Sequence, residues 1–245
     1  MLADVWDGYV FVLVVPEHGC HLVRLNKAVN MHYSQAAVVI GNGESRSSLD
    51  LANLKNTVTL IGCNAIHRDL AVDHLVCCDQ RMVKEAVANK TISHIYTRPR
   101  YFRDFHKILQ KDAVNNLPNL PYQGTLKPDQ PEHWGSGPYA TLLAAHLKFK
   151  SVYMVGFDLH GKNRLVNNVY KDTNNYLPAG KPAVDPAYWI YQGRKVFQSY
   201  ESVKFKIFNL PEWTLPTEWQ LPNVEVFDLN KFTLELANEV NTMYT

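Results

Sequence analysis

Short apolar runs recur along the chain from residue 36 onward, and segments of helical character separate them. Ala36–Ile40 reads AAVVI and is apolar at every position, which is typical of a strand buried on both faces of a parallel sheet. Similar runs predict strands at 57–61, 73–79, 93–97, 151–158, 204–210 and 223–229. Helices are predicted at 101–111, 139–149 and 230–243, with others that begin at 47 and 185 and one that ends near 88, and a helical turn is predicted at 64–70. This alternation predicts an α/β domain with a doubly wound, mostly parallel, Rossmann-like sheet.

Two polar stretches interrupt the alternation. Residues 115–134 carry four prolines, and residues 159–184 are rich in Asn, Lys and Tyr. Loops longer than about 12–15 residues are often ligand-binding segments or lids. We therefore expect two long loops, 113–135 and 159–184, that close over a ligand and exclude water.

The first 35 residues have a different pattern. YVFVLVV and CHLVRL flank a four-residue turn and predict a β-hairpin. Met31 offers an internal start, so this piece is an appendage or an upstream extension of the reading frame. We expect a hairpin at 1–35 and a single Rossmann-like nucleotide-binding domain at 36–245. The longest apolar run is far below the ~20 residues that cross a bilayer, and no signal peptide is predicted.

Composition narrows the class of protein. The 245 residues are 46% hydrophobic with a net charge of +2, so a sizeable core is available. The absence of a long basic run argues against a nucleic-acid or anionic-membrane surface. The four cysteines have no C-x-x-C spacing, and three lie in apolar strand-like runs. We expect free thiols in a cytoplasmic protein, and the oligomeric state stays open.

A glycine turn, Gly41-Asn42-Gly43-Glu44-Ser45-Arg46, follows the first buried strand and opens a helix. Glycines let a backbone approach a phosphate or sugar, and a helix N-terminus favours an anion. A dinucleotide fingerprint is excluded, because Arg46 replaces the third glycine and the second strand leads into Asn64 instead of an acidic ribose-binding residue. A Walker phosphate loop is excluded because G-K-[S/T] is absent. The turn predicts a mononucleotide or nucleotide-sugar site, with a tight turn alone as the alternative.

Other candidate ligand-binding residues stand where strands end or helices begin. Asn64, Asp79 and Asp158 follow three strands, and the carboxyl ends of parallel strands meet at one edge of a sheet. An amide such as Asn64 can pair with ribose or base edges, although a plain turn asparagine and helix-capping aspartates are alternatives. Ser136-Gly137 opens a helix whose amides could hold a phosphate or a base carbonyl. The alternative there is simple N-capping by Ser136.

The second loop carries donors that could neutralise a departing phosphate without a metal. They are His160, Lys162, Arg164, Tyr170, Lys171 and Tyr176. A solvated, mobile loop has a similar composition, so both interpretations stay open. No HxH, HExxH or DxD spacing occurs among the ten histidines and the acidic residues, and we predict no tightly bound metal. The lack of a G-x-S-x-G elbow argues against a serine hydrolase.

Four motifs in order resemble a known family. G-N-G-x-S follows the first strand, G-C-N the second, S-G opens a helix, and a later strand ends in G-F-D. This order, over residues 38–158, resembles the bacterial, metal-independent sialyltransferases that use CMP-sialic acid. It also resembles uncharacterised proteins of tailed phages, which would place the chain in the host cytoplasm.

The resemblance implies roles for particular residues. Gly41, Asn42, Gly43 and Ser45 would line the donor phosphate and sugar, Asn64 would bond the cytidine portion, Ser136 and Gly137 would contact the nucleotide, and Asp158 would hold ribose or base. The family has proline where this chain has Glu44, and a phosphate-steadying tyrosine where it has His160. The family's downstream general-base histidine has no counterpart in 185–197. Either Asp185 or His160 would then transfer the proton from the acceptor hydroxyl.

A second resemblance gives an alternative function. Archaeal-type pterin diphosphokinases share a glycine turn after the first strand and a strand that ends in aspartate, as at Asp79. They transfer diphosphate from ATP with Mg²⁺, but their G-P-S-L turn is not intact here. We therefore expect a glycosyltransferase with a nucleotide-sugar donor, a glycan or other hydroxyl acceptor and no bound cofactor. A diphosphokinase that needs Mg²⁺ and a non-catalytic nucleotide-binding phage protein are the alternatives.

Overall fold

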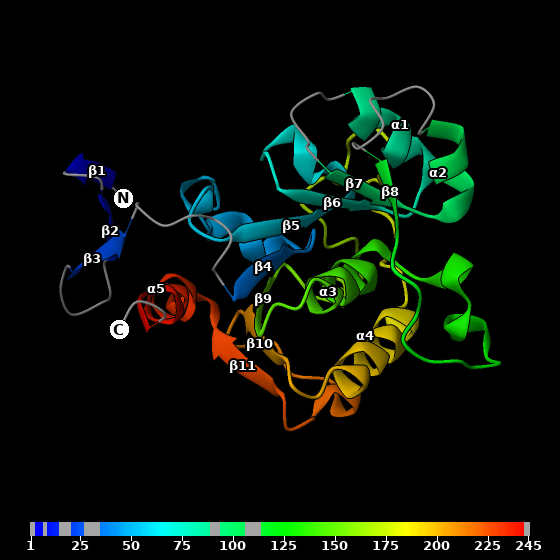
Figure 1. Ribbon diagram of the computed structural model, residues 1–245. Helices are drawn as coiled ribbons and strands as arrows, with labels where there is room; N and C mark the ends of the chain where they lie inside the picture. The colour runs from blue at the N-terminus through cyan, green and yellow to red at the C-terminus, as the bar shows by residue number, and fades with distance from the viewer. Residues whose placement is uncertain are drawn as a thin grey trace.

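The computed structural model describes residues 3–6, 9–14, 21–26, 35–88, 94–105 and 114–242 (Figure 1). Within these ranges eight strands form one sheet in the order β11-β10-β9-β4-β5-β6-β7-β8, and every neighbouring pair is parallel. The strands are β4 (Ala36–Ile40), β5 (Thr59–Cys63), β6 (His74–Cys77), β7 (His94–Thr97), β8 (Val114–Asn116), β9 (Ser151–Val155), β10 (Lys204–Asn209) and β11 (Val224–Asp228). The predicted Rossmann-like α/β sheet is confirmed.

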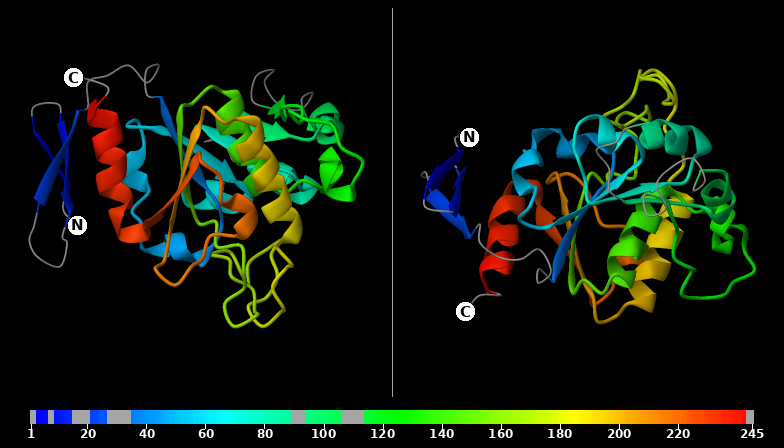
Figure 2. Two further views of the ribbon diagram at one scale, coloured as in Figure 1. Left: turned by 90° about the horizontal axis from the view of Figure 1, so that it is seen from below. Right: turned by 45° about the horizontal axis from the view of Figure 1, so that its top comes forward.

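Helices cover both faces of this sheet because its central strands alternate apolar side chains between two cores. Ala36, Val38 and Ile40 of β4 point into one core, and Ala37 and Val39 point into the other. The first core is closed by α1 (Gln80–Ala88), α2 (Pro99–Phe105) and α5 (Phe232–Thr242), and the second by α3 (Ser136–His146) and α4 (Ala187–Ser199). Figure 2 shows α3 and α4 side by side, away from α5. The sheet is therefore doubly wound, as predicted.

Three predicted elements need correction. Val114–Asn116 forms the edge strand β8, although residues 115–134 were expected to be loop throughout. The helix expected at 101–111 begins at Pro99, and its predicted end lies outside the described residues. The helix expected after the glycine turn is a five-residue 3₁₀ helix, η1 (Glu44–Ser48).

The strand order reverses at β4. The chain runs outward from β4 through β5, β6 and β7 to β8, and then returns to place β9 on the opposite side of β4. Ile40 and Val155 are partners at the carboxyl ends of these two strands. The turns that follow them, Gly41–Gly43 and Gly156–Asp158, are therefore neighbours at the point where open α/β sheets place their ligands.

The N-terminal residues lie in a separate sheet. Tyr9–Val14 (β2) and His21–Asn26 (β3) pair antiparallel, as the hairpin prediction requires, and Ala3–Trp6 (β1) joins β2. The division at residue 35 stays a prediction.

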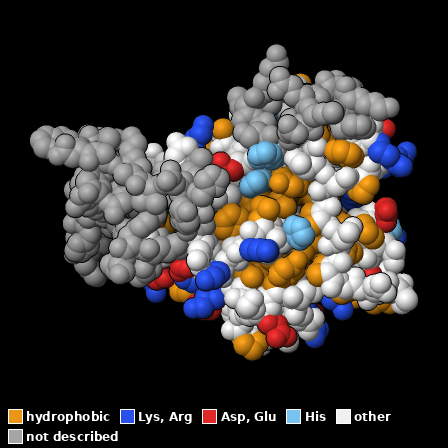
Figure 3. Space-filling model, in the orientation of Figure 1, with side chains coloured by type: hydrophobic (Ala, Val, Ile, Leu, Met, Phe, Trp, Pro, Cys, Tyr) orange, Lys and Arg blue, Asp and Glu red, His pale blue; other side chains and the backbone are white. Residues whose placement is uncertain are grey.

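In the described part of the chain, none of the helices has the length and apolar character needed to span a bilayer. The space-filling view shows hydrophobic side chains gathered near α3 on the face turned to the viewer (Figure 3).

Candidate functional site

A cavity of about 610 Å³ lies over the carboxyl ends of β9, β4, β5, β6 and β7. Strands in a sheet are about 4.8 Å apart, so these five strand ends extend over about 19 Å, enough for a nucleotide and an attached sugar. The predicted residues that line it are Gly41, Asn42, Gly43, Asn64, Asp79, Ser136, Gly137 and Asp158. The structure therefore gathers eight of the twelve predicted binding residues at one site, and their contact with a ligand stays a prediction.

The glycines of the turn allow two strand ends to pack together. The Gly41 amide donates to the Val155 carbonyl at 2.8 Å, and the Gly43 amide donates to the Gly156 carbonyl at 2.9 Å. A Cβ added at Gly41 would overlap the Gly156 carbonyl, and one added at Gly43 would overlap the Asp158 carboxylate. These amides are used within the protein, so the glycines have a structural reason besides any approach to a phosphate.

Hydrogen bonds between Ser45 and Asp158 connect the same two turns, which follow β4 and β9. Asp158 is 8% exposed, and its carboxylate accepts from the Ser45 amide at 3.0 Å and from the Ser45 hydroxyl. Ser45 and Arg46 are buried and do not line the cavity. Because η1 is a short 3₁₀ helix, the expectation that a helix N-terminus after the turn would bind an anion loses its basis.

The second long loop is bound to the glycine turn. The Val169 amide donates to the Asn42 carbonyl at 2.9 Å, and the Glu44 amide donates to Asn167 Oδ1 at 3.0 Å. Lys171 forms an ion pair with Glu44. Any lid motion of this part of the loop would have to break these contacts.

The two tyrosines of that loop support the turn from outside the cavity. Tyr170 accepts from Arg46 Nη2 at 2.9 Å, and Tyr176 accepts from Asn42 Nδ2 at 3.2 Å and from the Ala65 amide at 3.4 Å. Burial raises the pKa of both phenols, so they stay protonated at neutral pH. Neither lines the cavity. Their predicted contact with the nucleotide would require this loop to move.

The opposite wall is built around Ser136. Its hydroxyl donates to Asn64 Oδ1 at 2.9 Å and accepts from the Cys78 amide at 3.1 Å. The N-cap of α3 is Gly135 and has no side-chain capping bond, so Ser136 joins the ends of β5 and β6 to α3 and does not act as the N-cap. Ser136 and Gly137 line the cavity, and their amides find no acceptor among the described residues.

The backbone conformation of residue 64 also favours an asparagine. Its φ is +50°, a left-handed conformation that asparagine tolerates better than most residues. With its oxygen engaged by Ser136, the side-chain nitrogen donates to no group of the described residues. The side chain is therefore held in place with donors available to a ligand.

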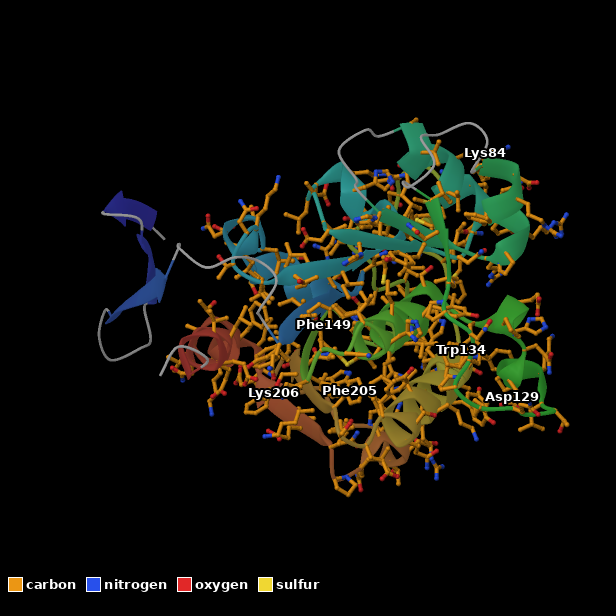
Figure 4. The ribbon with its side chains drawn as sticks, in the orientation of Figure 1. Lys84, Asp129, Trp134, Phe149, Phe205 and Lys206 are labelled. Atoms are coloured by element: carbon orange, nitrogen blue, oxygen red, sulfur yellow. The ribbon has the colours of Figure 1, made fainter. Side chains whose placement is uncertain are left out.

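Several residues of the cavity were not predicted as ligand-binding residues from the sequence. Two of them, Cys63 and Phe157, lie within the G-C-N and G-F-D motifs. The others include Cys78, Arg98, Tyr101, Trp134, Thr141, Asn167, Asn168 and Trp189. Figure 4 shows Trp134 between α3 and the segment 127–133. Arg98 follows the carboxyl end of β7, so the strand-end rule that singled out Asn64 and Asp79 could have found it.

The cysteines at and beside the site are buried. Cys63, Cys77 and Cys78 are free and buried, whereas Cys20 lies outside the described residues. Burial raises the pKa of the Cys78 thiol, although Arg98 and Ser136 partly oppose this effect. These cysteines are protonated, small apolar side chains at neutral pH. In the described ranges no three His, Cys, Asp or Glu side chains gather closely enough to hold a metal ion.

The two predicted catalytic residues lie together in a neighbouring hollow. His160 and Asp185 line a space of about 500 Å³ with Arg194 and Glu218. Asp185 Oδ1 accepts from the Ala187 amide at 2.9 Å, at the start of α4. The hollow adjoins the cavity, because residues 159, 189 and 219 line the cavity while residues 160, 190 and 218 line the hollow.

The known family models and the curated proteins give no match to this sequence. Solved sialyltransferases share its fold. The α-2,3-sialyltransferase Cst-I of Campylobacter jejuni is 15% identical with a TM-score of 0.54, over 84% of this chain and 85% of that one. The sialyltransferase CST-II with trisaccharide acceptor and CMP is 14% identical with a TM-score of 0.52, over 80% of this chain and 87% of that one. CstII of Campylobacter jejuni with CMP is 14% identical with a TM-score of 0.51, over 80% of this chain and 86% of that one. The chain therefore has a sialyltransferase-like fold, as the four motifs predicted.

Proposed function

We propose that this protein is a glycosyltransferase that uses a CMP-type nucleotide-sugar donor without a metal ion. One observation carries the proposal: the pair of Asn64 and Ser136 presents unused donors inside the cavity at the strand-order reversal. The fold adds support, because two of the similar sialyltransferase structures hold CMP. The resemblances to phage proteins and to pterin diphosphokinases stay predictions.

The donor lies across the carboxyl ends of β4, β5 and β6. The nucleotide contacts Asn42, Gly43 and the Asn64 carboxamide, and its phosphate accepts from the amides of Ser136 and Gly137 at the start of α3. These amides stabilise the charge that grows on the phosphate as the bond to the anomeric carbon breaks. The helix N-terminus therefore supplies the electrostatic help that a metal gives in other transferases.

The reaction is a direct displacement. The acceptor oxygen forms a bond to the anomeric carbon, the bond from that carbon to the phosphate oxygen breaks, and the acceptor proton passes to a base. His160 or Asp185 is the proposed base, and the acceptor hydroxyl would reach it where the hollow adjoins the cavity. A well-placed base contributes about 10²–10⁴-fold, so the variant that removes it should lose kcat by that factor while CMP affinity is unchanged.

Binding and release of CMP test the function. We expect CMP to raise the melting temperature in the presence of EDTA, and the protein to release CMP from CMP-sialic acid. A shift with ATP that requires Mg²⁺ would support the diphosphokinase instead. If none of CMP, UDP, GDP and ATP shifts the transition, with or without Mg²⁺, the proposal is wrong.

Asn64→Gly is the sharpest variant. Alanine at φ +50° would add backbone strain, whereas glycine adopts this conformation freely and removes only the side chain. Asn56 is exposed with a φ of +67° and does not line the cavity, so Asn56→Gly is the matched control. We expect Asn64→Gly to weaken CMP binding at least 10-fold and Asn56→Gly to leave it unchanged. Equal affinities would remove Asn64 from the site.

A further inference from the structure

The segment of residues 159–184 begins at the rim of the cavity and returns to it. Leu159 lines the cavity and His160 lines the adjoining hollow, and Asn167 and Asn168 line the cavity again. Figure 2 shows this yellow-green segment protruding beyond the ends of the neighbouring helices. We call its residues 162–166 and 181–184 the loop tip. The loop tip therefore belongs to a protruding part of the molecule beside the mouth of the candidate site.

Backbone pairing makes the loop tip compact. Leu165 forms antiparallel β-bridges with both Lys162 and Pro182, and its amide donates to the Lys162 carbonyl at 3.0 Å. The Ala183 amide donates to the Arg164 carbonyl at 2.9 Å. Residues directly opposite each other in antiparallel pairs carry their side chains on the same face. The side chains of Lys162, Leu165 and Pro182 therefore lie beside one another on one face.

Arg164 adopts a costly backbone conformation at the turn of the loop tip. Asn163 and Arg164 have φ of +53° and +65°, as the two central residues of a type I′ turn do. Glycine and asparagine are usual at such positions, whereas a residue with a long side chain such as arginine seldom adopts this conformation. The Arg164 side chain is exposed, and it has no hydrogen bond or ion pair among the described residues. Its cationic group is therefore presented to the outside of the molecule.

The loop tip combines positive charge with exposed aliphatic side chains. Its cations are Lys162, Arg164 and Lys181, and it contains no carboxylate. All three cations are exposed, and none forms an ion pair with the described residues. Leu165 is 43% exposed and Val184 is 53% exposed. The sequence has no long basic run, so this concentration of charge arises from the pairing of residues 162–166 with residues 181–183.

This combination fits the surface of an anionic bilayer. There, aliphatic side chains enter the boundary between headgroups and acyl chains, and each lysine or arginine is attracted to the negative charge of the lipids. A nucleic acid would engage the cations but leave Leu165 and Val184 in water. Two copies of this chain joined at this surface would bring like charges together, which is unfavourable.

We propose that the loop tip docks on an anionic phospholipid bilayer, so that the cavity opens beside the membrane surface. Leu165 and Val184 enter the headgroup region, and Lys162, Arg164 and Lys181 contact lipid phosphates. The docking goes beyond the proposed function and does not require it. It also revises the expectation, drawn from the absence of a long basic run, that the protein has no surface for an anionic membrane.

Sedimentation with lipid vesicles tests the role of charge. The vesicles consist of phosphatidylcholine alone or of phosphatidylcholine mixed with phosphatidylglycerol, at low and at high salt. We expect the wild type to bind the mixed vesicles, to bind phosphatidylcholine much more weakly, and to dissociate at high salt. The tip variant combines Lys162→Gln, Arg164→Gln and Lys181→Gln, and its control makes the same change at three exposed positions elsewhere, Lys127→Gln, Lys204→Gln and Lys231→Gln. The tip variant should bind the mixed vesicles more weakly, by about fivefold for each cation removed, and the control should bind as the wild type does.

A second pair of variants tests the aliphatic contact. Leu165→Ser removes an exposed leucine from the loop tip, and Leu126→Ser removes a leucine that is 57% exposed elsewhere. Leu165→Ser should weaken binding to the mixed vesicles about tenfold, because the apolar transfer free energy of the side chain is lost, and Leu126→Ser should not change it. Both variants should keep the wild-type melting temperature, with and without CMP. Failure of the wild type to bind CMP would contradict only the proposed function.

Absence of wild-type binding to the mixed vesicles would overturn the docking proposal. Equal binding to both kinds of vesicle, or an equal loss in the tip variant and its control, would overturn it as well. The same holds for a wild type that binds duplex DNA through the loop tip in place of vesicles. A wild-type dimer in sedimentation equilibrium that Leu165→Ser dissociates, without vesicle binding, would assign the loop tip to a second copy of this chain and overturn the proposal.

Discussion

The two walls of the cavity differ in whether their backbone amides have acceptors within the protein. In the glycine-turn wall, made of residues 41–46 and 156–158, the amides of Gly41, Gly43 and Ser45 all donate to protein acceptors. In the α3 wall, made of Asn64, Cys78, Arg98, Ser136 and Gly137, several donors have no acceptor among the described residues. The first wall holds two strand ends together, and the second contains the donors that we propose bind a ligand.

This difference shows that the most conspicuous motif of the sequence need not be the one that contacts the ligand. A glycine turn after a buried strand is the more conspicuous pattern in a sequence, yet here its glycines are required by the packing of the two turns. The α3 wall has only Asn64 and the short Ser136-Gly137 pair as signals. We therefore expect substitutions in the glycine-turn wall to reduce stability, and substitutions in the α3 wall to reduce binding.

The largest expected effect is that of Gly41→Ala. The added Cβ would overlap the backbone of Gly156, which cannot move without disturbing the pairing of β4 with β9. We expect a loss of about 3 kcal/mol in the free energy of unfolding, measured by urea denaturation. Gly180→Ala is the control, because nothing lies within 4 Å of a Cβ there. Equal stabilities for the two variants would contradict the packing role of Gly41.

A smaller loss is expected for Asp158→Ala. The substitution leaves the buried amide and hydroxyl of Ser45 without their acceptor, which costs about 2 kcal/mol. Asp104→Ala, at an exposed position of α2, should change stability by less than about 0.5 kcal/mol. If Asp158→Ala instead keeps its stability and loses CMP affinity, Asp158 belongs functionally to the α3 wall.

The smallest expected loss of stability is that of a substitution at Glu85, a residue of α1 outside the cavity. Glu85 accepts from Arg68 Nε at 2.5 Å and from Asn175 at 3.0 Å, and Arg68 also donates to Thr173 at 2.7 Å. The Arg68 hydrogen bond holds the pKa of Glu85 below its usual 4.5. A lowered folded-state pKa means that this stabilisation is complete above about pH 4.5 and is lost as pH falls through the lower value.

Glu85→Gln should therefore cost about 0.5 kcal/mol at pH 7, because the pair is partly exposed. The difference from wild type should shrink as the pH falls below 4.5, which denaturation at pH 7, 5 and 3 measures. A difference that grows on acidification would show that Glu85 has no depressed pKa. Glu132→Gln, an exposed carboxylate on the segment before α3, should show no such trend.

The sequence was sufficient to predict those elements whose physical signal lies within a few neighbouring residues. The all-apolar run Ala36–Ile40 predicted a strand covered on both faces, and both cores confirm it. β8 was missed because Val114–Asn116 is a three-residue edge strand with one buried side chain and two polar residues. The contacts of Ser45 with Asp158 join residues 113 positions apart, and no local pattern reports such a pairing. Trp134 and Trp189 reach the cavity only through the packing of α3 and α4.

The contact between Gly43 and Asp158 also bears on how distant relatives of this chain can be found. A Cβ at residue 43 would overlap the carboxylate of residue 158, so a larger residue at position 43 is tolerated only if residue 158 changes with it. Homologues should therefore vary at these two positions jointly, as residues in contact do. A search that scores the glycine turn and the distant aspartate as one unit should detect chains whose overall identity is too low for ordinary alignment.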